Sequence, residues 1–155
     1  MSWYELLLFV HVAMAVIWVG GGFVVQVLAI LVRRSGDPVR VAGFAGDAEQ
    51  VGMKLFTPAS LLLFLSAIGL MLVDGSPWEW GDPFVSVGLL VWLVSFLAGV
   101  LYLGPTAGKI KREIDANGFD APRAQRLIRS VFLYQRLELV LLFVAVFMMT
   151  VKLGT

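Results

Sequence analysis

The only histidine of the chain lies in the run HVAMAVIWVGGGF, which covers residues 11–23. Apart from the indole of Trp18, this run has no other side chain that can form a hydrogen bond. Positions three, four, seven and eleven residues apart return to the same face of a helix. One helical face would therefore carry His11, Ala15, Trp18, Gly22 and Gln26. Lipid tails do not solvate histidine or glutamine, so we expect this face to turn toward the interior of a helical bundle or toward a partner.

The residue types expected around His11 suit a haem iron or a copper ion. Four methionines are predicted in the same membrane leaflet, namely Met14, Met71, Met148 and Met149. A neutral imidazole with thioether sulfur nearby can bind haem iron or Cu(I) without any carboxylate. The chain has no cysteine, which excludes disulfides and thiolate metal sites. The residues alone leave haem iron and copper both open as the metal that His11 would bind.

A purely structural role for the same residues is an alternative that the pattern leaves open. Methionine often fills irregular gaps in cores, and a single histidine can simply form a hydrogen bond between helices. The glycines at 20–22 favour close approach of a neighbouring helix, because small residues let two backbones come together. Gly21 and Gly22, with Trp18, would either shape the wall of a pocket or form a packing seam.

A second ionisable group lies inside an apolar segment. Glu138 and Arg136 are two residues apart, so on a helix they point about 200° apart and do not pair with each other. Arg136 can reach the headgroups with its long side chain, whereas Glu138 lies deeper and requires an interior partner or a proton. One interpretation is a hydrogen bond to another helix, with Ser60, Ser95 or Tyr102 as candidates. The other interpretation is a proton or ion site at Glu138.

The composition places these residues in an all-α membrane protein. Hydrophobic residues make up 59% of the 155 residues, and charged residues only 15%. Four apolar segments approach or exceed the roughly 20 residues that a helix needs to cross a bilayer. We place these spans at 4–32, 57–74, 83–105 and 130–152, and we expect residues 1–155 to form a single domain, a four-transmembrane-helix bundle. The first span lacks a preceding basic residue and a cleavage site, so we expect it to stay in the mature protein.

Several dipeptides and single residues mark expected helix ends. The sequences TP at 57–58 and DP at 82–83 are each typical of a helix cap and first turn. Short helical extensions are expected in the two basic loops: a frayed or interfacial helix from Asp37, and a continuation of the third span that kinks at Pro105 and stops at Gly118. Asp120 is the predicted cap of the last helix.

Basic residues set the expected orientation, because Lys and Arg are retained on the cytoplasmic side of a membrane. The loops after the first and third spans contain Arg33, Arg34, Arg40, Lys54, Lys109, Lys111, Arg112, Arg123, Arg126 and Arg129. The loop between the second and third spans has acidic residues and no basic one. We therefore expect both termini outside. Arg123, Arg126 and Arg129 recur every three residues and could bind anionic lipid headgroups, although retention of basic residues explains them equally well.

Two stretches carry a resemblance to a known family. The run HVAMAVIWVGGGF, with a tryptophan seven residues after the histidine and then glycines, resembles the first helix of a bacterial family of predicted integral membrane proteins of unknown function. The ending LELVLLFVAVFMMTVKLG also resembles that family. The family is similar to copper-resistance D proteins and to HemJ-type protoporphyrinogen oxidases. The resemblance thus implies a multi-pass protein of the bacterial inner membrane.

The resemblance also indicates a role for the histidine. In HemJ-type proteins the corresponding helix carries a histidine that binds haem b, which implies that His11 is the haem b position here. The second ligand would then be Met71, Met148 or Met149, or a second His11 in a homodimer. Those oxidases have further histidines that this chain lacks, so the resemblance does not extend to oxidase activity.

Three hypotheses about function follow. The first is a small haem b protein for electron transfer or porphyrin handling. The second is a non-catalytic accessory or scaffold subunit of a larger membrane complex, whose polar stripe packs against the partner. The third is a small ion or metal transporter that uses Glu138. A net charge of only +1 and the lack of a phosphate-binding loop or a basic-aromatic surface give no support for a nucleic-acid partner.

Overall fold

The computed structural model describes residues 2–74 and 76–151. Lys152, the last residue of the fourth predicted span, lies outside the described residues. The described chain consists of helices, joined by short connections and interrupted by π-helical turns. The elements in order are α1 (Trp3–Ala15), η1 (Val16–Gly20), α2 (Gly21–Arg34), α3 (Pro38–Val51), η2 (Gly52–Phe56), α4 (Thr57–Leu72), α5 (Pro83–Ala98), η3 (Gly99–Leu103), α6 (Gly104–Asn117) and α7 (Pro122–Val151).

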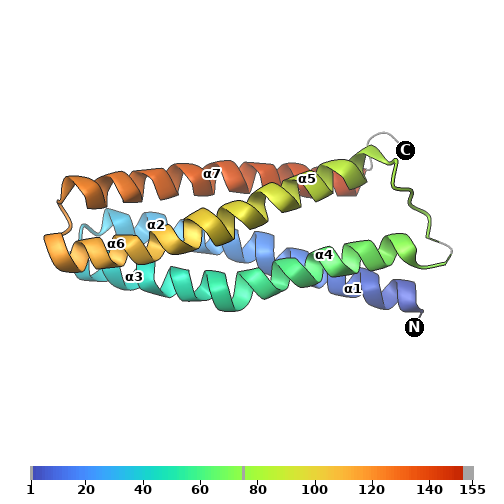
Figure 1. Cartoon of the computed structure of the whole chain (residues 1–155), viewed down its shortest axis with the longest axis horizontal. Coiled ribbons are helices and arrows are strands. Elements are labelled where there is room, and N and C mark those ends of the chain that lie inside the picture. Colours follow the sequence, from blue (N-terminus) through green and yellow to red (C-terminus); the bar gives the residue numbers. More distant parts are fainter. Residues whose placement is uncertain (1, 75, 152–155) are drawn as a thin grey trace.

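Consecutive elements join into four long rods, which confirms the predicted all-α four-helix bundle (Figure 1). The rods run from Trp3 to Arg34, from Pro38 to Leu72, from Pro83 to Asn117 and from Pro122 to Val151, and each is long and apolar enough to cross a membrane. Their lengths of 32, 35, 35 and 30 residues exceed the roughly 20 residues that a bilayer requires. Each rod therefore extends beyond the hydrocarbon layer.

Large apolar side chains cover much of the outside of the bundle, as expected for a surface that faces lipid. Examples that are more than half exposed are Phe9, Leu31, Leu101, Val140 and Phe147. In a soluble protein such side chains would be driven into the core by the hydrophobic effect, whereas acyl chains solvate them as well as a protein interior does.

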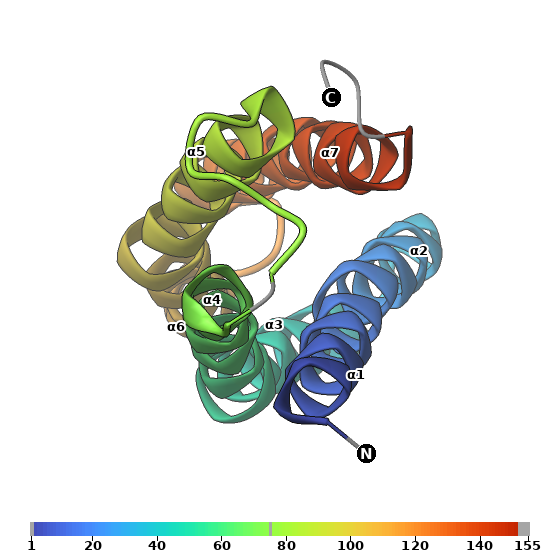
Figure 2. The ribbon, with the colours of Figure 1, turned by 90° about the vertical axis from the view of Figure 1, so that its right-hand side faces the viewer.

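The rods form a ring, which Figure 2 shows from the end that holds both termini. Helix α1 packs along α4, α3 packs along α6, and α5 packs along α7. The ring closes where α2 contacts α7, but α1 and α7 lie apart at the terminal end (Figure 2). We call this the terminal end, and the opposite end, with the connections at 35–37 and 118–121, the arginine-rich end.

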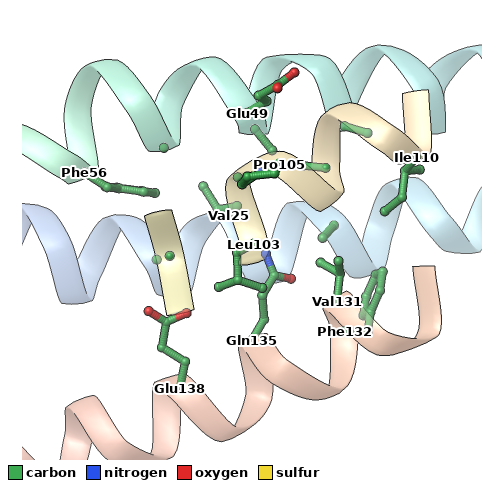
Figure 3. Close-up of a pocket in the computed structure, with 18 of the residues that line it drawn as sticks. Val25, Glu49, Phe56, Leu103, Pro105, Ile110, Val131, Phe132, Gln135 and Glu138 are labelled. Carbon is green, nitrogen blue, oxygen red and sulfur yellow. The ribbon is translucent and has the colours of Figure 1, made fainter. Parts of the chain in front are cut away.

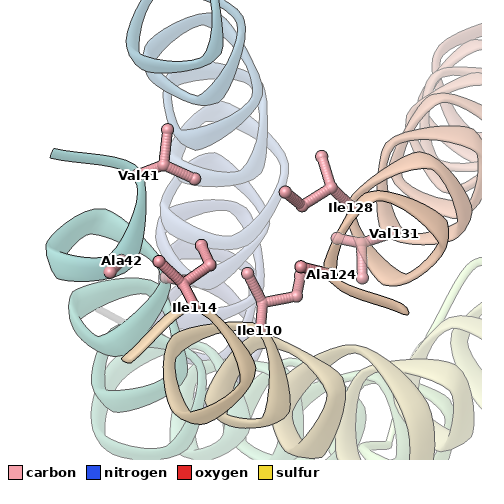
Figure 4. Close-up of a cluster of buried hydrophobic side chains, with 8 residues drawn as sticks. Val41, Ala42, Ile110, Ile114, Ala124, Ile128 and Val131 are labelled. Atoms are coloured by element: carbon pink, nitrogen blue, oxygen red, sulfur yellow. The ribbon is translucent and has the colours of Figure 1, made fainter. Parts of the chain in front are cut away.

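The arginine-rich end has its own apolar core, which Figure 4 shows. Helices α3, α6 and α7 contribute Val41, Ala42, Ala45, Ile110, Ile114, Ala124, Ile128 and Val131 to this cluster. Asp37 caps α3 as predicted, since its carboxylate accepts the backbone N–H of Val39 at 2.9 Å. Of the two alternatives after Asp37, the frayed helix is wrong, because this packed core stabilises α3 in spite of its glycines, and the interfacial helix stays a prediction.

Three other predicted helix ends can be compared with the structure. Gly118 ends α6 with φ of +87°, a left-handed conformation that favours glycine, which confirms that boundary. Asp82 precedes α5 as predicted, but its carboxylate accepts the backbone N–H of Glu79 instead of capping the helix. The predicted cap at Asp120 is wrong, because α7 begins at Pro122 and its first backbone bond runs from Gln125 to the Ala121 carbonyl.

The α-helical segment α4 begins at Thr57 with Pro58 in its first turn, as predicted, but Thr57 does not cap it, because the rod continues from α3 through η2 into α4. The hydroxyl of Thr57 donates to the carbonyl of Gly52 at 2.9 Å, one π-helical turn earlier. The turns η2 and η3 lie against each other, near mid-bundle. π-helical turns inside long helices are often associated with functional sites.

Candidate functional site

His11 lies on the inner side of α1 and bonds to α4. Its Nδ1 is 3.1 Å from the backbone carbonyl oxygen of Leu63, so the ring N–H donates to that oxygen. The hydroxyl of Ser66 donates to the same carbonyl at 2.9 Å and lies 3.4 Å from Nδ1. This arrangement favours the tautomer with the proton on Nδ1. The other ring nitrogen, Nε2, has no hydrogen-bond partner among the described residues and keeps a free lone pair.

A cavity of about 330 Å³, which we call the histidine cavity, lies beside His11 in the terminal half of the bundle. All four rods contribute to its wall. The lining is mainly apolar and rich in aromatic rings, which come from Tyr4, Trp18, Phe64, Trp78, Trp80, Phe84 and Trp92. This volume falls within the range of small-molecule sites, roughly 300–1,000 Å³.

The structure brings some of the predicted methionines to this cavity and not others. Met71 and Met149 line it. A side chain on Gly88 of α5 would collide with the terminal methyl group of Met149, so the missing side chain of Gly88 leaves room for Met149 between α5 and α7. Met14 packs instead against the Trp18 cluster, and Met148 does not line the cavity. Thioether sulfur is thus available from two helices.

Hydrogen bonds of aromatic side chains fix the wall of the histidine cavity. The indole N–H of Trp92 donates to the Ser60 carbonyl at 2.9 Å and links α5 to α4. Its ring stacks on Phe64 and Phe96, with centroid distances of 4.1 and 5.1 Å. At the terminal end, the indole N–H of Trp78 donates to the hydroxyl of Tyr4 at 3.2 Å.

An apolar layer closes the histidine cavity toward the middle of the bundle. The layer consists of Trp18, Leu63, Val91 and Leu142, one residue from each rod, and all four are at most 9% exposed. Trp18 and Leu142 also line a second cavity on the other side. The layer therefore separates two cavities that follow each other along the bundle.

The second cavity, which we call the glutamate cavity, has a volume of about 410 Å³ and extends toward the arginine-rich end (Figure 3). Glu138 and Gln135 project into it from α7 (Figure 3). Ser60 and Ser95 line it from α4 and α5. No hydrogen bond joins Glu138 to either serine or to Tyr102 within the described chain, and the ring of Tyr102 packs instead against Tyr134.

The remaining predicted site residues lie near these cavities. Gly22 lines the glutamate cavity, whereas a side chain on Gly21 would meet the ring of Phe56 at 2.6 Å, so Gly21 is where α2 closely approaches η2. Gln26 is buried, with no hydrogen-bond partner for either amide atom among the described residues. The predicted stripe from His11 to Gln26 therefore faces the interior of this chain's own bundle.

The arginines predicted to bind lipid lie on the first turns of α7. Arg123, Arg126 and Arg129 are all exposed. The guanidinium of Arg123 is 3.6 Å from the carboxylate of Glu113 on α6, a pair whose arginine is exposed and whose glutamate is half-buried. Their exposure leaves them accessible to headgroups.

Three polar contributions to the two cavities were not expected from the sequence. The Leu63 carbonyl and Ser66 orient His11, and Gln135 lines the glutamate cavity. Ser66 and Gln135 are polar residues within apolar stretches, which is a signal that could have indicated them. The main-chain oxygen of Leu63 leaves no such signal.

Comparisons with known proteins bear on the fold and not on the chemistry. Residues 5–153 match a family described as "Predicted integral membrane protein (DUF2269)". No curated protein and no solved structure matches the chain.

Proposed function

The chain belongs to this family of predicted integral membrane proteins, and we propose that it binds b-type haem in the histidine cavity, where His11 would hold the iron. The observation that carries the proposal is the arrangement of the His11 ring, with Nδ1 bonded to the Leu63 carbonyl and Nε2 free. Histidines that bind a metal commonly donate their other ring N–H to a carbonyl or carboxylate, which fixes the tautomer and the ring orientation.

The donor set of the cavity fits haem better than a hydrated divalent metal. Nowhere in residues 2–74 and 76–151 do three or more His, Cys, Asp or Glu side chains gather into a group that could hold a metal ion. The cavity instead offers one imidazole, the thioethers of Met71 and Met149, and aromatic walls. Haem iron accepts a histidine and a methionine as axial ligands, and its flat apolar macrocycle packs well against aromatic side chains.

Haem bound in this way supplies one-electron exchange, and the protein residues around it define the environment. His11 Nε2 would hold the iron, and the Leu63 carbonyl would raise the basicity of the ring. The apolar layer of Trp18, Leu63, Val91 and Leu142 would keep water away from the deep side of the cavity. Copper at the same residues is the alternative, and the relation to copper-resistance D and HemJ-type proteins stays a prediction.

The absorption spectrum of the purified protein tests the proposal. Cells supplied with haem should yield a coloured protein with a Soret band, and His11→Ala should lose that band because the iron loses its only histidine. Free imidazole added to His11→Ala should restore part of the band, since it can replace the missing ring without any change in the fold. A colourless wild-type protein from haem-supplied cells, or an unchanged Soret band in His11→Ala, would overturn the proposal.

A further inference from the structure

The glutamate cavity contains polar groups without partners, which the haem proposal does not use. Ser95 is 2% exposed, and its hydroxyl oxygen has no hydrogen-bond partner among the described residues; the same holds for the buried Oε1 of Gln135. Glu138, one helical turn after Gln135 on α7, forms no hydrogen bond or ion pair with the described chain. An unsatisfied buried polar group costs about 1–3 kcal/mol, so such groups in native structures commonly bind water or a ligand.

The charges around Glu138 leave its carboxylate uncompensated. Arg136 is exposed and points away from the cavity, because it is two residues from Glu138 on the same helix. A side chain on Gly22 would lie 4.0 Å from Leu139, which places Glu138 at the level of Gly22. Arg33 lines the cavity eleven residues further along α2, roughly 16 Å toward the arginine-rich end.

The other charged groups of the lining are also distant from Glu138. Arg112 is exposed near the end of α6, at the arginine-rich end. The Glu49 carboxylate lies against Gly108 where α3 meets α6, across the cavity from Glu138 (Figure 3). The deep part of the cavity, where the structure describes it, therefore has one carboxyl group in apolar surroundings, and a ligand with one positive charge would stabilise its ionised form.

The size and lining of the cavity favour an organic ligand over a bare ion. A volume of about 410 Å³ greatly exceeds the space that one inorganic cation needs, and most of the lining is apolar. Four phenylalanine rings contribute to it: Phe44, Phe56, Phe96 and Phe132. Aromatic faces attract cations and also pack against apolar groups. We propose that the glutamate cavity binds a hydrophobic organic cation with a single positive charge, held by the Glu138 carboxylate with Gln135 and Ser95 as further oxygen acceptors.

Tetraphenylphosphonium, a hydrophobic monovalent cation, is a suitable probe for this site. The full chain, purified in a neutral detergent, should bind it saturably at about one probe per chain in equilibrium dialysis against a blank of empty micelles. Glu138→Gln should raise the Kd roughly thirtyfold or more, because it removes one partner of a buried charge pair. Glu79→Gln, which neutralises an exposed carboxylate in the connection between α4 and α5, is the matched control and should leave the Kd unchanged.

Four further measurements make the outcome unambiguous. Tetraphenylborate has the same shape as the probe and the opposite charge, and it should not bind saturably. Glu138→Asp keeps the carboxylate and should retain measurable binding, which separates loss of charge from loss of fold.

The proposal is overturned if the wild type does not bind the probe, if Glu138→Gln binds it equally well, if the borate binds as tightly, or if low millimolar sodium displaces the probe. His11→Ala should keep probe binding, so failure of the haem proposal would not affect this result.

Discussion

At the scale of single residues, His11 illustrates how a polar ring is accommodated at membrane depth. An imidazole among apolar side chains loses its hydration, and the Leu63 carbonyl replaces one of the two hydrogen bonds that water would supply. Helical carbonyls already accept an N–H bond but keep a second lone pair, so this acceptor is available at little cost to α4. Nε2 is left without a partner among the described residues, and if the proposed function is correct, it is the atom that would bind iron.

The proposed function predicts that one of two adjacent methionines matters to the haem. Met149 lines the histidine cavity and lies against Gly88, whereas the neighbouring Met148 does not line it. Met149→Leu keeps a similar volume but removes the sulfur, so the bound haem should change its visible absorption bands and become more accessible to carbon monoxide. Met148→Leu should leave the spectrum unchanged. Equal spectra for the two variants would assign the second axial position to another group.

The contacts of Trp92 predict that this side chain contributes measurably to the stability of the protein. Trp92→Phe removes the hydrogen bond to the Ser60 carbonyl and preserves an aromatic ring between Phe64 and Phe96. The expected cost is about 1 kcal/mol, the usual net value of one hydrogen bond, seen as a lower midpoint of thermal unfolding in detergent. The matched control is Trp3→Phe, since Trp3 is 74% exposed and lines neither cavity. An equal midpoint for both variants would contradict the prediction.

The sequence predicted some residues of the histidine site and could not predict others, for physical reasons. Residue type and helical spacing identified His11 and Trp18, because an imidazole and an indole are conspicuous in an apolar helix. The same reasoning could not find the partner of His11, since it is a main-chain oxygen 52 residues away. It also could not separate Met149 from Met148, because that difference depends on the rotation of α7 against α5.

At the scale of helices, the sequence located the spans but not their continuity. The runs GMKLFTP and GVLYLGP each begin with a glycine and end with a proline, and in each the first five residues form a π-helical turn, η2 or η3. Proline lacks the N–H that the carbonyl four residues earlier would accept, so a regular α-helix cannot pass through it undisturbed. The wider π-helical turn accommodates the proline without ending the rod. From the sequence alone, a TP dipeptide predicts the start of a separate helix, because the π-helical turn that precedes it cannot be recognised from composition.

The close approach of α2 to η2 predicts opposite effects for two adjacent glycines. A side chain on Gly20 would meet nothing within 4 Å, whereas one on Gly21 would meet the Phe56 ring at 2.6 Å. Gly20→Ala should maintain or raise the free energy of unfolding, because alanine restricts the unfolded chain. Gly21→Ala should lower it by about 1–3 kcal/mol relative to Gly20→Ala, as the ring must shift. Unfolding midpoints in detergent measure both.

A double substitution checks the cause of that difference. Phe56→Leu removes the ring atoms that approach Gly21, so Gly21→Ala should cost much less in a Phe56→Leu background. A cost that does not depend on residue 56 would show that Gly21 acts through backbone conformation and not through packing.

At the scale of the whole molecule, the fold arranges two chemically different cavities along one axis. The terminal half has the imidazole and thioethers, the arginine-rich half has the carboxylate, and one apolar layer separates them. α1 and α7 lie apart at the terminal end (Figure 2), whereas α3 and α6 pack closely at the other end, where Gly108 approaches Glu49. The bundle is therefore open between α1 and α7 at the terminal end, whereas the arginine-rich end has a packed core.

The distribution of charge predicts how this molecule lies in its membrane. Exposed basic residues gather around the connections at 35–37 and 118–121, and the connection at 73–82 contains acidic residues and no basic one. Because basic loops are retained in the cytoplasm, the arginine-rich end should face the cytoplasm and the terminal end should face outward. The histidine cavity would then lie in the outer leaflet and the glutamate cavity toward the inner one.

Single cysteines can test this orientation directly, since the natural sequence contains none. Glu79→Cys and Ala116→Cys both replace exposed side chains, the first near the terminal end and the second near the arginine-rich end. In intact spheroplasts, a membrane-impermeant maleimide should label Glu79→Cys and should label Ala116→Cys only after the membrane is permeabilised. The reverse pattern would invert the topology, and it would place His11 on the cytoplasmic side, where a haem ligand would exchange electrons with different partners. Equal labelling of both before permeabilisation would contradict a four-span topology that places these connections on opposite sides.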